Sequence, residues 1–257
     1  MSPEPRVHPS AAAGFERAVA DYEAGRPSFP PEAVALLTRE LGLAPGRTCI
    51  ELGPGTGKLT ELLRPAGARI VGIEPVAAMR AAFARNLPGL GLVGGVAEEL
   101  PLRDGCAQAA VAAQAFHWFD GPRALRELAR TLVDGSSLGL IWNVRDEDTP
   151  WVRAMTETIE PYRGTTPSHR SMRWREAFAG TDAFADPERT SFPYVHRTSP
   201  ERTVARVLSI SFIAILPDEE RAAVADRIRE IVPAGGTIDV PYRTDVWLSR
   251  RSSATIA

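Results

Sequence analysis

The stretch Cys49-Ile50-Glu51-Leu52-Gly53-Pro54-Gly55-Thr56-Gly57-Lys58 determines how this chain is interpreted. It is typical of the end of a buried strand, a glycine turn and the first turn of a helix. Gly53, Gly55 and Gly57 let the backbone turn sharply and approach a ligand, because no Cβ is in the way. A helix that opens at Gly57 would point free N–H groups at that ligand. Glu51 argues against a phosphate in the loop, because its carboxylate would repel an anion.

Three interpretations compete for this loop. A dinucleotide fingerprint, G-x-G-x-x-G, needs a glycine where the chain has Lys58. A phosphate-binding loop needs four residues between its first glycine and Gly-Lys, but only three lie between Gly53 and Gly57. The remaining pattern, acidic-x-G-x-G-x-G, resembles motif I of the class I S-adenosylmethionine (SAM) methyltransferases. That resemblance implies a loop under the methionine and ribose of SAM, with Glu51 holding the ammonium end. A plain glycine-rich turn in another α/β protein is the alternative.

Length and composition set the broad class. The chain has 257 residues, 44% of them hydrophobic, which suits one α/β domain over residues 1–257. The net charge of −2 provides no general basic field for nucleic acid or anionic lipid. Two cysteines form no disulfide framework or zinc pattern. No apolar stretch approaches the ~20 residues of a membrane span. We therefore expect a cytoplasmic protein with a small-molecule substrate, without a metal site, nucleic-acid partner or membrane partner.

A strand, a helix and a second strand surround the glycine loop. We expect the strand Thr48–Leu52, a helix beginning at Lys58–Leu63 and the strand Arg69–Glu74, which makes the two strands parallel. Glu74 follows the loop at roughly the 20-residue spacing of an acid that binds ribose hydroxyls. A carboxylate there can accept two hydrogen bonds from a vicinal diol. A solvated acid at the strand end is the alternative.

The next segments would form the adenine side of the site. Pro75 starts a helix in which Met79 is placed to cover one face of adenine. A third strand ends at Val96, and Ala97 and Glu98 follow it. The methyltransferases that the chain resembles usually have G-D-A-E here, with the Asp near the adenine amine, whereas this chain has Val96 at that position. The backbone of Ala97 and the side chain of Glu98 remain available to the base.

A fourth strand, Ala109–Ala115, leads into an aromatic cluster. Ligands in doubly wound folds bind outside the carboxyl ends of the strands, where this cluster falls. A-x-A-x-H-W-F-D is common in the subgroup that includes the trans-aconitate methyltransferases. The resemblance implies that Gln114 contacts the cofactor and that Phe116 and Trp118 flank the methyl group, with His117 beside them. An aromatic cluster that merely packs the loop is the alternative.

The segment Tyr22–Pro30 carries the pattern Y-x-x-x-R-P-S-F-P. This resembles the N-terminal segment of the same subgroup, which folds over the cofactor, and it implies contacts from Tyr22 and Arg26. An ordinary loop is the alternative. We expect helices before and after it, at Phe15–Tyr22 and Pro31–Leu41.

The motif resemblance covers residues 20–145, the predicted cofactor-binding core. Residues 146–257 are expected to complete the sheet and to form a substrate lid. Together the segments predict a Rossmann-like, doubly wound sheet of about seven mostly parallel strands, with helices on both faces and a helical lid. The later helices are expected at Trp151–Ile159, Arg173–Phe178, Glu201–Ile215 and Asp218–Ile231, and the later strands at Ser137–Asn143, Thr190–His196 and Ile238–Arg250.

The resemblance implies a SAM-dependent methyltransferase that releases S-adenosylhomocysteine and methylates an oxygen or nitrogen of a small molecule, carboxylates included. His117 would be a general base if the acceptor must lose a proton. With a carboxylate acceptor it would only orient the substrate. Two alternatives stay open. A non-methylating transferase of the same fold, such as an aminopropyl transferase, usually has an acidic base after the fourth strand. A non-catalytic SAM-binding protein is kept open by Val96.

Overall fold

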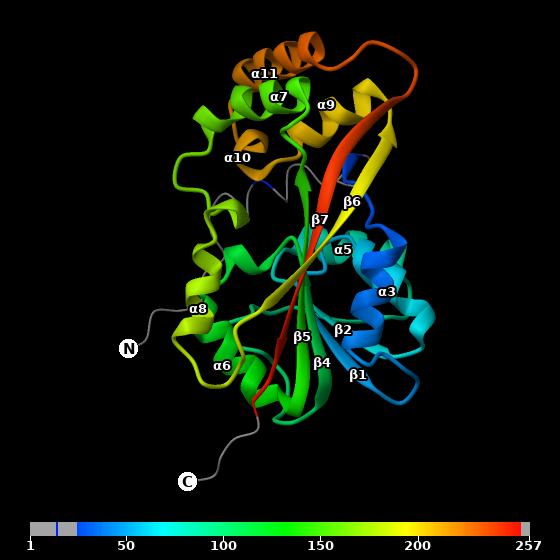
Figure 1. Cartoon of the computed structure of the whole chain (residues 1–257), viewed down its shortest axis with the longest axis vertical. Helices are drawn as coiled ribbons and strands as arrows, with labels where there is room; N and C mark the ends of the chain where they lie inside the picture. Colours follow the sequence, from blue (N-terminus) through cyan, green and yellow to red (C-terminus); the bar gives the residue numbers. More distant parts are fainter. Residues whose placement is uncertain (1–13, 15–24, 253–257) are drawn as a thin grey trace.

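The computed structural model describes residue 14 and residues 25–252. The expected helix at Phe15–Tyr22 lies outside these residues. The described part contains a seven-stranded sheet in the order β3-β2-β1-β4-β5-β7-β6 (Figure 1). Its strands are β1 Thr48–Leu52, β2 Arg69–Ile73, β3 Gly91–Val93, β4 Ala107–Ala113, β5 Leu132–Arg145, β6 Glu188–Thr198 and β7 Ile238–Arg250.

Strands β3, β2, β1, β4 and β5 are parallel, and β7 pairs antiparallel with both β5 and β6. Strand β4 consists of alanines and one valine apart from Gln108, and most of its residues are buried. This suits the centre of a sheet that is covered on both faces. The expected mostly parallel sheet is therefore confirmed. The carboxyl ends of its parallel strands meet at one edge, where the glycine loop and the aromatic cluster come together.

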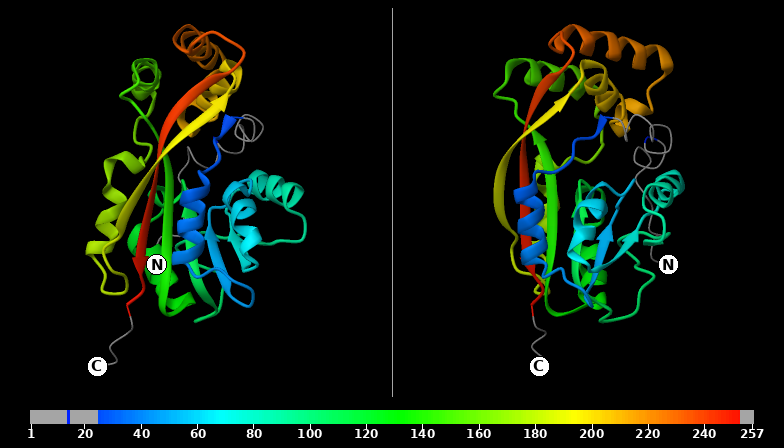
Figure 2. Two further views of the ribbon diagram at one scale, coloured as in Figure 1. Left: turned by 45° about the vertical axis from the view of Figure 1, so that its right-hand side comes forward. Right: turned by 90° about the vertical axis from the view of Figure 1, so that its right-hand side faces the viewer.

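Helices cover both faces of the sheet (Figure 2). On one face, α3 lies so close to β5 that a Cβ on Gly139 would come within 2.7 Å of Leu37 Cδ2. On the other face, α6 packs its buried side chains into a second hydrophobic cluster. Asp120 is the N-cap of α6, because its carboxylate accepts the Arg123 N–H at 3.2 Å. The helices of this part are α3 Pro31–Glu40, α4 Lys58–Leu63, α5 Ala77–Asn86, α6 Gly121–Thr131 and α8 Glu176–Ala179.

The remaining α-helices gather at one end of the molecule and form the lid, as expected (Figures 1 and 2). They are α7 Pro150–Ile159, α9 Pro200–Leu208, α10 Ser211–Ala214 and α11 Asp218–Ile231. Their buried side chains make a hydrophobic cluster of their own, which includes Ile238, Val240 and Tyr242 from the start of β7. Short 3₁₀ turns complete the chain at Arg64–Ala66, Phe116–Trp118, Glu160–Tyr162, His169–Ser171 and Arg173–Arg175.

Several predicted boundaries are wrong. The fourth strand ends at Ala113 instead of Ala115, and the fifth strand begins at Leu132 instead of Ser137. The predicted helix Glu201–Ile215 is two helices, and at the break the Ser209 hydroxyl donates to the Arg206 carbonyl at 2.8 Å. The third strand stops at Val93 instead of Val96, because the chain leaves the sheet at Gly94 and Gly95. The helix predicted from Pro75 begins two residues later, since the N–H of residue 76 is held by a side chain.

Candidate active site

The glycine loop has the backbone that its sequence predicts. Gly53, Gly55 and Gly57 have φ values of +61°, +58° and +92°, in the left-handed region that favours glycine. A Cβ on Gly57 would lie 2.5 Å from Leu87 Cδ1, so that position also has no room for a side chain. The loop thus joins β1 to the first turn of α4, with its backbone at the carboxyl edge of the sheet.

Glu74 sits at the end of β2 and is 5% exposed. One carboxylate oxygen accepts the Gly55 N–H at 3.0 Å and the other accepts the Val76 N–H at 2.9 Å. Burial raises the pKa of Glu74, while these two hydrogen bonds and Arg80 oppose the rise. Each oxygen keeps a second lone pair, so the carboxylate can still accept hydrogen bonds from a diol. Ribose binding by Glu74 remains a prediction.

Glu51 is fully buried beneath the loop. Its Oε2 accepts a hydrogen bond from the Thr60 hydroxyl at 2.6 Å, whereas no described residue donates a hydrogen bond to Oε1. Burial raises the pKa of Glu51 to about 7. The hydrogen bond from Thr60 lowers this pKa in part, and the negative charge of Glu74 raises it further. A buried acceptor without a partner is costly, and a ligand ammonium would satisfy it. The residues present therefore fit the ammonium end of SAM.

The adenine side differs in part from expectation. Met79 is only 2% exposed, so in this structure it packs inside the protein and offers no open face to a base. Ala97 is likewise buried, while Pro75 is half-buried at the start of the turn. Glu98 accepts the Asp120 N–H at 2.8 Å, which ties this side of the site to the loop after β4. Burial raises the pKa of Glu98, and the hydrogen bond from the Asp120 N–H is the main effect that opposes this rise.

Gln114 directly follows β4 and has an unusual backbone conformation. Its φ of +56° is in the left-handed region, which few residues other than glycine adopt. Its N–H donates to the Ile141 carbonyl at 2.9 Å, and its side-chain amide donates to the Asn143 carbonyl at 3.2 Å. Both bonds go to β5, so the conformation is fixed by the neighbouring strand. Strained residues of this kind cluster at ligand sites.

His117 follows on the 3₁₀ turn after β4, and its ring lies against β5. The Trp142 indole N–H donates to His117 Nδ1 at 3.2 Å. Burial, followed by the charges of His169, Arg26 and Arg163, lowers the pKa of His117 well below its usual range. The imidazole is therefore neutral near pH 7. Because Nδ1 accepts, the ring proton is on Nε2, which is a hydrogen-bond donor.

The two predicted substrate residues have different positions. Phe116 is fully buried and packs edge-on against Trp174, with ring centroids 6.3 Å apart, and at a tilt of 36° against Phe178, with ring centroids 5.7 Å apart. In this structure Phe116 is a core residue that anchors the turn, and its contact with the substrate stays a prediction. Trp118 is half-buried and lines a cavity together with His117.

The N-terminal segment is only partly described. Tyr22 lies outside the described residues. Arg26 is described, and its carbonyl accepts a hydrogen bond from Lys58 Nζ at 2.8 Å, so the segment is tied to the first turn of α4. Its side chain lines the same cavity as His117. Asn143 also holds the segment, by donating to the Ser28 carbonyl at 2.8 Å.

A cavity of about 120 Å³, which we call the inner cavity, lies between the carboxyl edge of the sheet and the lid. Gln114, His117 and Trp118 line it from the loop after β4. One acidic residue, Glu147, lines it as well. Five arginines are among the described residues that line the inner cavity, namely Arg26, Arg145, Arg163, Arg170 and Arg206. Arg163 pairs with Glu160 and Arg170 pairs with Glu147. The inner cavity is therefore suited to an anion.

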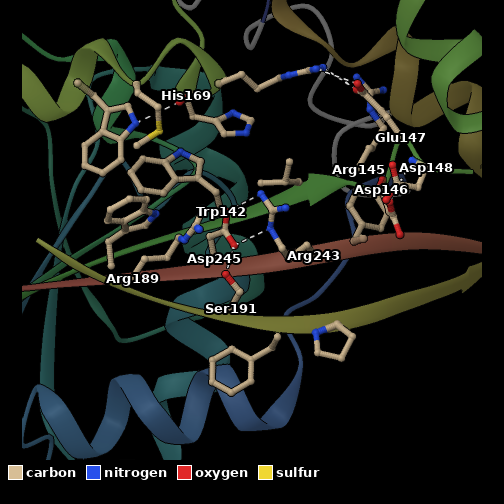
Figure 3. Close-up of a pocket in the computed structure, with 18 residues that line it drawn as sticks. Trp142, Arg145, Asp146, Glu147, Asp148, His169, Arg189, Ser191, Arg243 and Asp245 are labelled. Atoms are coloured by element: carbon tan, nitrogen blue, oxygen red, sulfur yellow. Dashed lines mark hydrogen bonds and ion pairs between the residues drawn. The ribbon is translucent and has the colours of Figure 1, made fainter.

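A larger hollow of about 770 Å³, the outer groove, opens beside the inner cavity (Figure 3). Figure 3 shows Trp142 and His169 on one side of it, with Arg189, Arg243 and Asp245 along the strands. Arg243 and Asp245 pair at 2.8 Å. The inner cavity and the outer groove share six lining residues, Val144, Arg145, Glu147, His169, Arg170 and Tyr242.

Arg145, Arg163 and His169 were not among the predicted site residues. They lie at the end of β5 and in the chain between α7 and β6, where no motif marks them. Only the fold brings them to the carboxyl edge of the sheet. A run of arginines and histidines beyond Arg145 is visible in the sequence, but it could equally have been a solvated surface.

Several known proteins are similar to this chain in sequence. A model of the methyltransferase domain matches residues 50–140. The chain is 36% identical over 218 residues to an uncharacterised methyltransferase of Mycobacterium bovis, a match covering 85% of each chain. It is 33% identical over 247 residues to a methyltransferase-like protein of Schizosaccharomyces pombe, with 93% of this chain and 96% of the relative covered.

Two solved structures show the same fold at low sequence identity. The YcgJ protein of Bacillus subtilis has a TM-score of 0.57 at 14% identity and covers 87% of this chain, which in turn covers 99% of it. The [4+2]-cyclase SpnF has a TM-score of 0.61 at 16% identity, with 97% and 99% covered. The fold and the glycine loop define a class I methyltransferase. The chain belongs to this family and is a SAM-dependent methyltransferase.

No helix among the described residues has the length and apolar character needed to cross a membrane. The expectation of a cytoplasmic protein is not addressed by this observation.

Proposed function

We propose that the protein methylates a carboxylate oxygen of a small molecule that is bound in the inner cavity. When bound, SAM supplies a methyl group that its sulfonium has already activated. The chain's residues must then bind and orient the acceptor and exclude water. Glu51, the glycine loop and Glu74 would hold SAM, while Gln114, His117 and Trp118 would face the acceptor.

The hydrogen bond from Trp142 to His117 carries this proposal. A general base needs a free lone pair within reach of the proton it removes. The lone pair of His117 is at Nδ1 and accepts the indole N–H, while the other nitrogen already carries a proton. His117 can therefore donate a hydrogen bond to the acceptor, but it is poorly arranged to take a proton. This arrangement favours an acceptor that is already deprotonated near pH 7.

The charge of the inner cavity supports the same acceptor. Arginines outnumber carboxylates among the described residues that line it, and Nη1 of Arg145 has no hydrogen-bond partner among them, so the cavity would attract a carboxylate and repel a protonated amine. Carboxylic acids have pKa values near 4, so they are ionised without the help of a base. Phenols have pKa values near 10 and would need one.

Two other functions are less well supported. The likeness to the [4+2]-cyclase SpnF indicates that this fold also serves other reactions, as folds commonly do. An aminopropyl transferase usually has an acidic base after the fourth strand, where this chain has Gln114 and His117. A non-catalytic SAM-binding protein needs no charged acceptor cavity beside the cofactor loop.

A turnover screen tests the proposal. The purified protein, SAM and panels of carboxylic acids, phenols and amines are incubated, and S-adenosylhomocysteine and methylated products are measured by mass spectrometry. We expect methyl esters from one or more carboxylic acids. Turnover of phenols or amines with no turnover of any acid would contradict the proposal. SAM binding without turnover of any acceptor would instead favour the non-catalytic alternative.

A further inference from the structure

Two buried nitrogens at the border of the inner cavity and the outer groove have no hydrogen-bond partner among residues 14 and 25–252. They are Nη1 of Arg145, at the end of β5, and Nε2 of His169, on the 3₁₀ turn between α7 and β6. Both residues line both hollows. Buried polar groups are nearly always hydrogen-bonded, so two such nitrogens at one place need an explanation. A ligand that accepts hydrogen bonds would satisfy both.

Arg145 is the charged member of this pair. Burial lowers the pKa of Arg145, with Tyr242 and Glu147 opposing the change, but an arginine this basic keeps its charge. The carboxylate of Glu147 is already committed, because it binds Arg170 with two contacts of 2.6 and 2.8 Å. A guanidinium that has a buried nitrogen and no ion-pair partner in the described part of the chain is unfavourable until an anion joins it.

His169 lines the same two hollows as Arg145 and is held in place by aromatic neighbours. Its ring stacks on Trp142 with the centroids 6.2 Å apart and the planes at 18°. Its carbonyl accepts the Trp174 indole N–H at 3.1 Å, which fixes the backbone of the turn. Burial and then the charge of Arg170 lower the pKa of His169 to about 4, so its ring is neutral and can donate one hydrogen bond.

We propose that Arg145 and His169 form an oxyanion site that holds a charged group of the acceptor other than the one that is methylated. This proposal rests on the proposed function in one respect, namely that the acceptor occupies the inner cavity. Two nitrogen donors, one of them cationic, match the oxygens of a carboxylate or a phosphate group.

Chemistry distinguishes the anchored group from the reacting one. An oxygen that is paired with a guanidinium is a weaker nucleophile, and methylation would remove the charge that anchors it. A group that keeps its charge throughout the reaction can hold both the acceptor and the product in place. Because the inner cavity and the outer groove share lining residues, the rest of such an acceptor could extend into the outer groove.

Anion binding without turnover tests the site directly. The full-length protein, saturated with S-adenosylhomocysteine, is titrated with sodium acetate, sodium phosphate or sodium chloride while long-range ¹H–¹⁵N spectra record the histidine rings. The chain has four histidines, so each ring can be assigned by substitution. We expect acetate or phosphate, but not chloride at equal ionic strength, to shift the His169 Nε2 signal with saturation. Acetate alone indicates a carboxylate site, and phosphate alone a phosphoryl site.

Matched variants locate the anion. Arg145→Met should weaken the saturating oxyanion by about tenfold or more, as expected for hydrogen bonds to a charged group. Arg189→Met removes the same charge from an exposed arginine of the outer groove and should leave the affinity unchanged. His169→Phe keeps a ring on Trp142 but removes Nε2, and should also weaken the anion. His196→Phe, outside both hollows, is its control.

The outcomes are separable from those of the proposed function. The oxyanion site would be overturned if neither acetate nor phosphate shifts the His169 signal with saturation. It would also be overturned if Arg145→Met and Arg189→Met lose the same oxyanion affinity. Both conclusions hold even if a carboxylic acid is methylated. Saturable binding at Arg145 and His169 would uphold the site even if the turnover screen finds no carboxylate acceptor. If Arg145→Met does not fold by circular dichroism, the His169→Phe and His196→Phe pair decides.

Discussion

The carboxylate of Glu74 accepts the backbone N–H of Gly55 at 3.0 Å, which joins the end of β2 to the middle of the glycine loop. The residue predicted to bind the ribose therefore also shapes the loop predicted to lie under it. A substitution at Glu74 will consequently affect SAM in two ways, by direct contact and through the loop.

Replacing Glu74 by Ala should weaken SAM by about 1.5–3 kcal/mol, the usual loss for hydrogen bonds to a charged group. Glu74→Gln keeps one oxygen acceptor and should lose less. Calorimetry with SAM and with its 2′-deoxyribose analogue separates the two effects. The analogue should bind more weakly than SAM to the parent, with a smaller difference in Glu74→Ala. The same difference in both proteins would show that the carboxylate does not contact the ribose.

Gly55→Ala should weaken SAM strongly, because it strains a backbone with φ of +58° and places a methyl group where the ligand approaches. Gly46→Ala is the matched control. Gly46 has φ of +83° and open space around its Cβ position, so it suffers similar strain, about 1–2 kcal/mol, away from the loop. Thermal unfolding should show comparable destabilisation of the two variants, while calorimetry should show loss of SAM binding in Gly55→Ala only. Equal SAM affinities would remove the loop from the site.

SAM affinity should depend on the ionisation of Glu51. Burial, partly opposed by Thr60, raises the pKa of Glu51 to about 7, so in the free protein the group is protonated below that pH. Because an ammonium binds the carboxylate form, the affinity should be greatest above pH 7. It should fall as the pH drops below 7, by up to tenfold per pH unit. Calorimetry from pH 5.5 to 7.5 measures this slope. The slope should disappear in Glu51→Gln, and a slope that persists there would assign it to another group.

Trp142→Phe should lower kcat with little change in SAM affinity. The substitution keeps an aromatic ring but removes the indole N–H that fixes the orientation of His117. The parent should show no loss of kcat between pH 8 and pH 6 that depends on His117, because that ring is neutral and its lone pair is occupied. A pH–rate profile of the parent and of His117→Gln, with an accepted substrate, tests this. A fall of kcat below pH 6–7 in the parent, absent from His117→Gln, would restore His117 as a general base.

Local sequence patterns were enough to predict the secondary structure around the cofactor loop. A glycine run with alternate spacing has few backbone solutions, and a strand–helix–strand segment has one preferred handedness, so β1, α4 and β2 followed directly. The position of Asp120 before α6 was likewise a local property. Glu51 could be placed in the site from its position, although its partner Thr60 and its raised pKa depend on burial that no local pattern reports.

The acceptor half depended on contacts between distant segments. Phe116 and His117 are adjacent in the sequence, yet one is in the core and the other lines the inner cavity. Their roles separated only when Trp174 and Trp142 were in place around them. Arg145 and His169 illustrate the same point, since their common surroundings arise from the end of β5 meeting a turn that follows α7. The break between α9 and α10 also depends on the packing of the lid.

Strands β6 and β7 run without interruption from the sheet into the lid, paired over eleven positions. Val246 of β7 packs in a cluster on one face of the sheet, and Tyr242 of the same strand packs in the lid cluster. The lid is therefore attached to the sheet through two long, hydrogen-bonded strands. A rigid-body movement of the lid away from the sheet would bend these strands or break the hydrogen bonds between β6 and β7. Acceptor and product should instead pass by way of the segment that carries His169 and Arg170, which is attached to the end of the sheet by side-chain contacts, the ion pair of Arg170 with Glu147 and the stacking of His169 on Trp142.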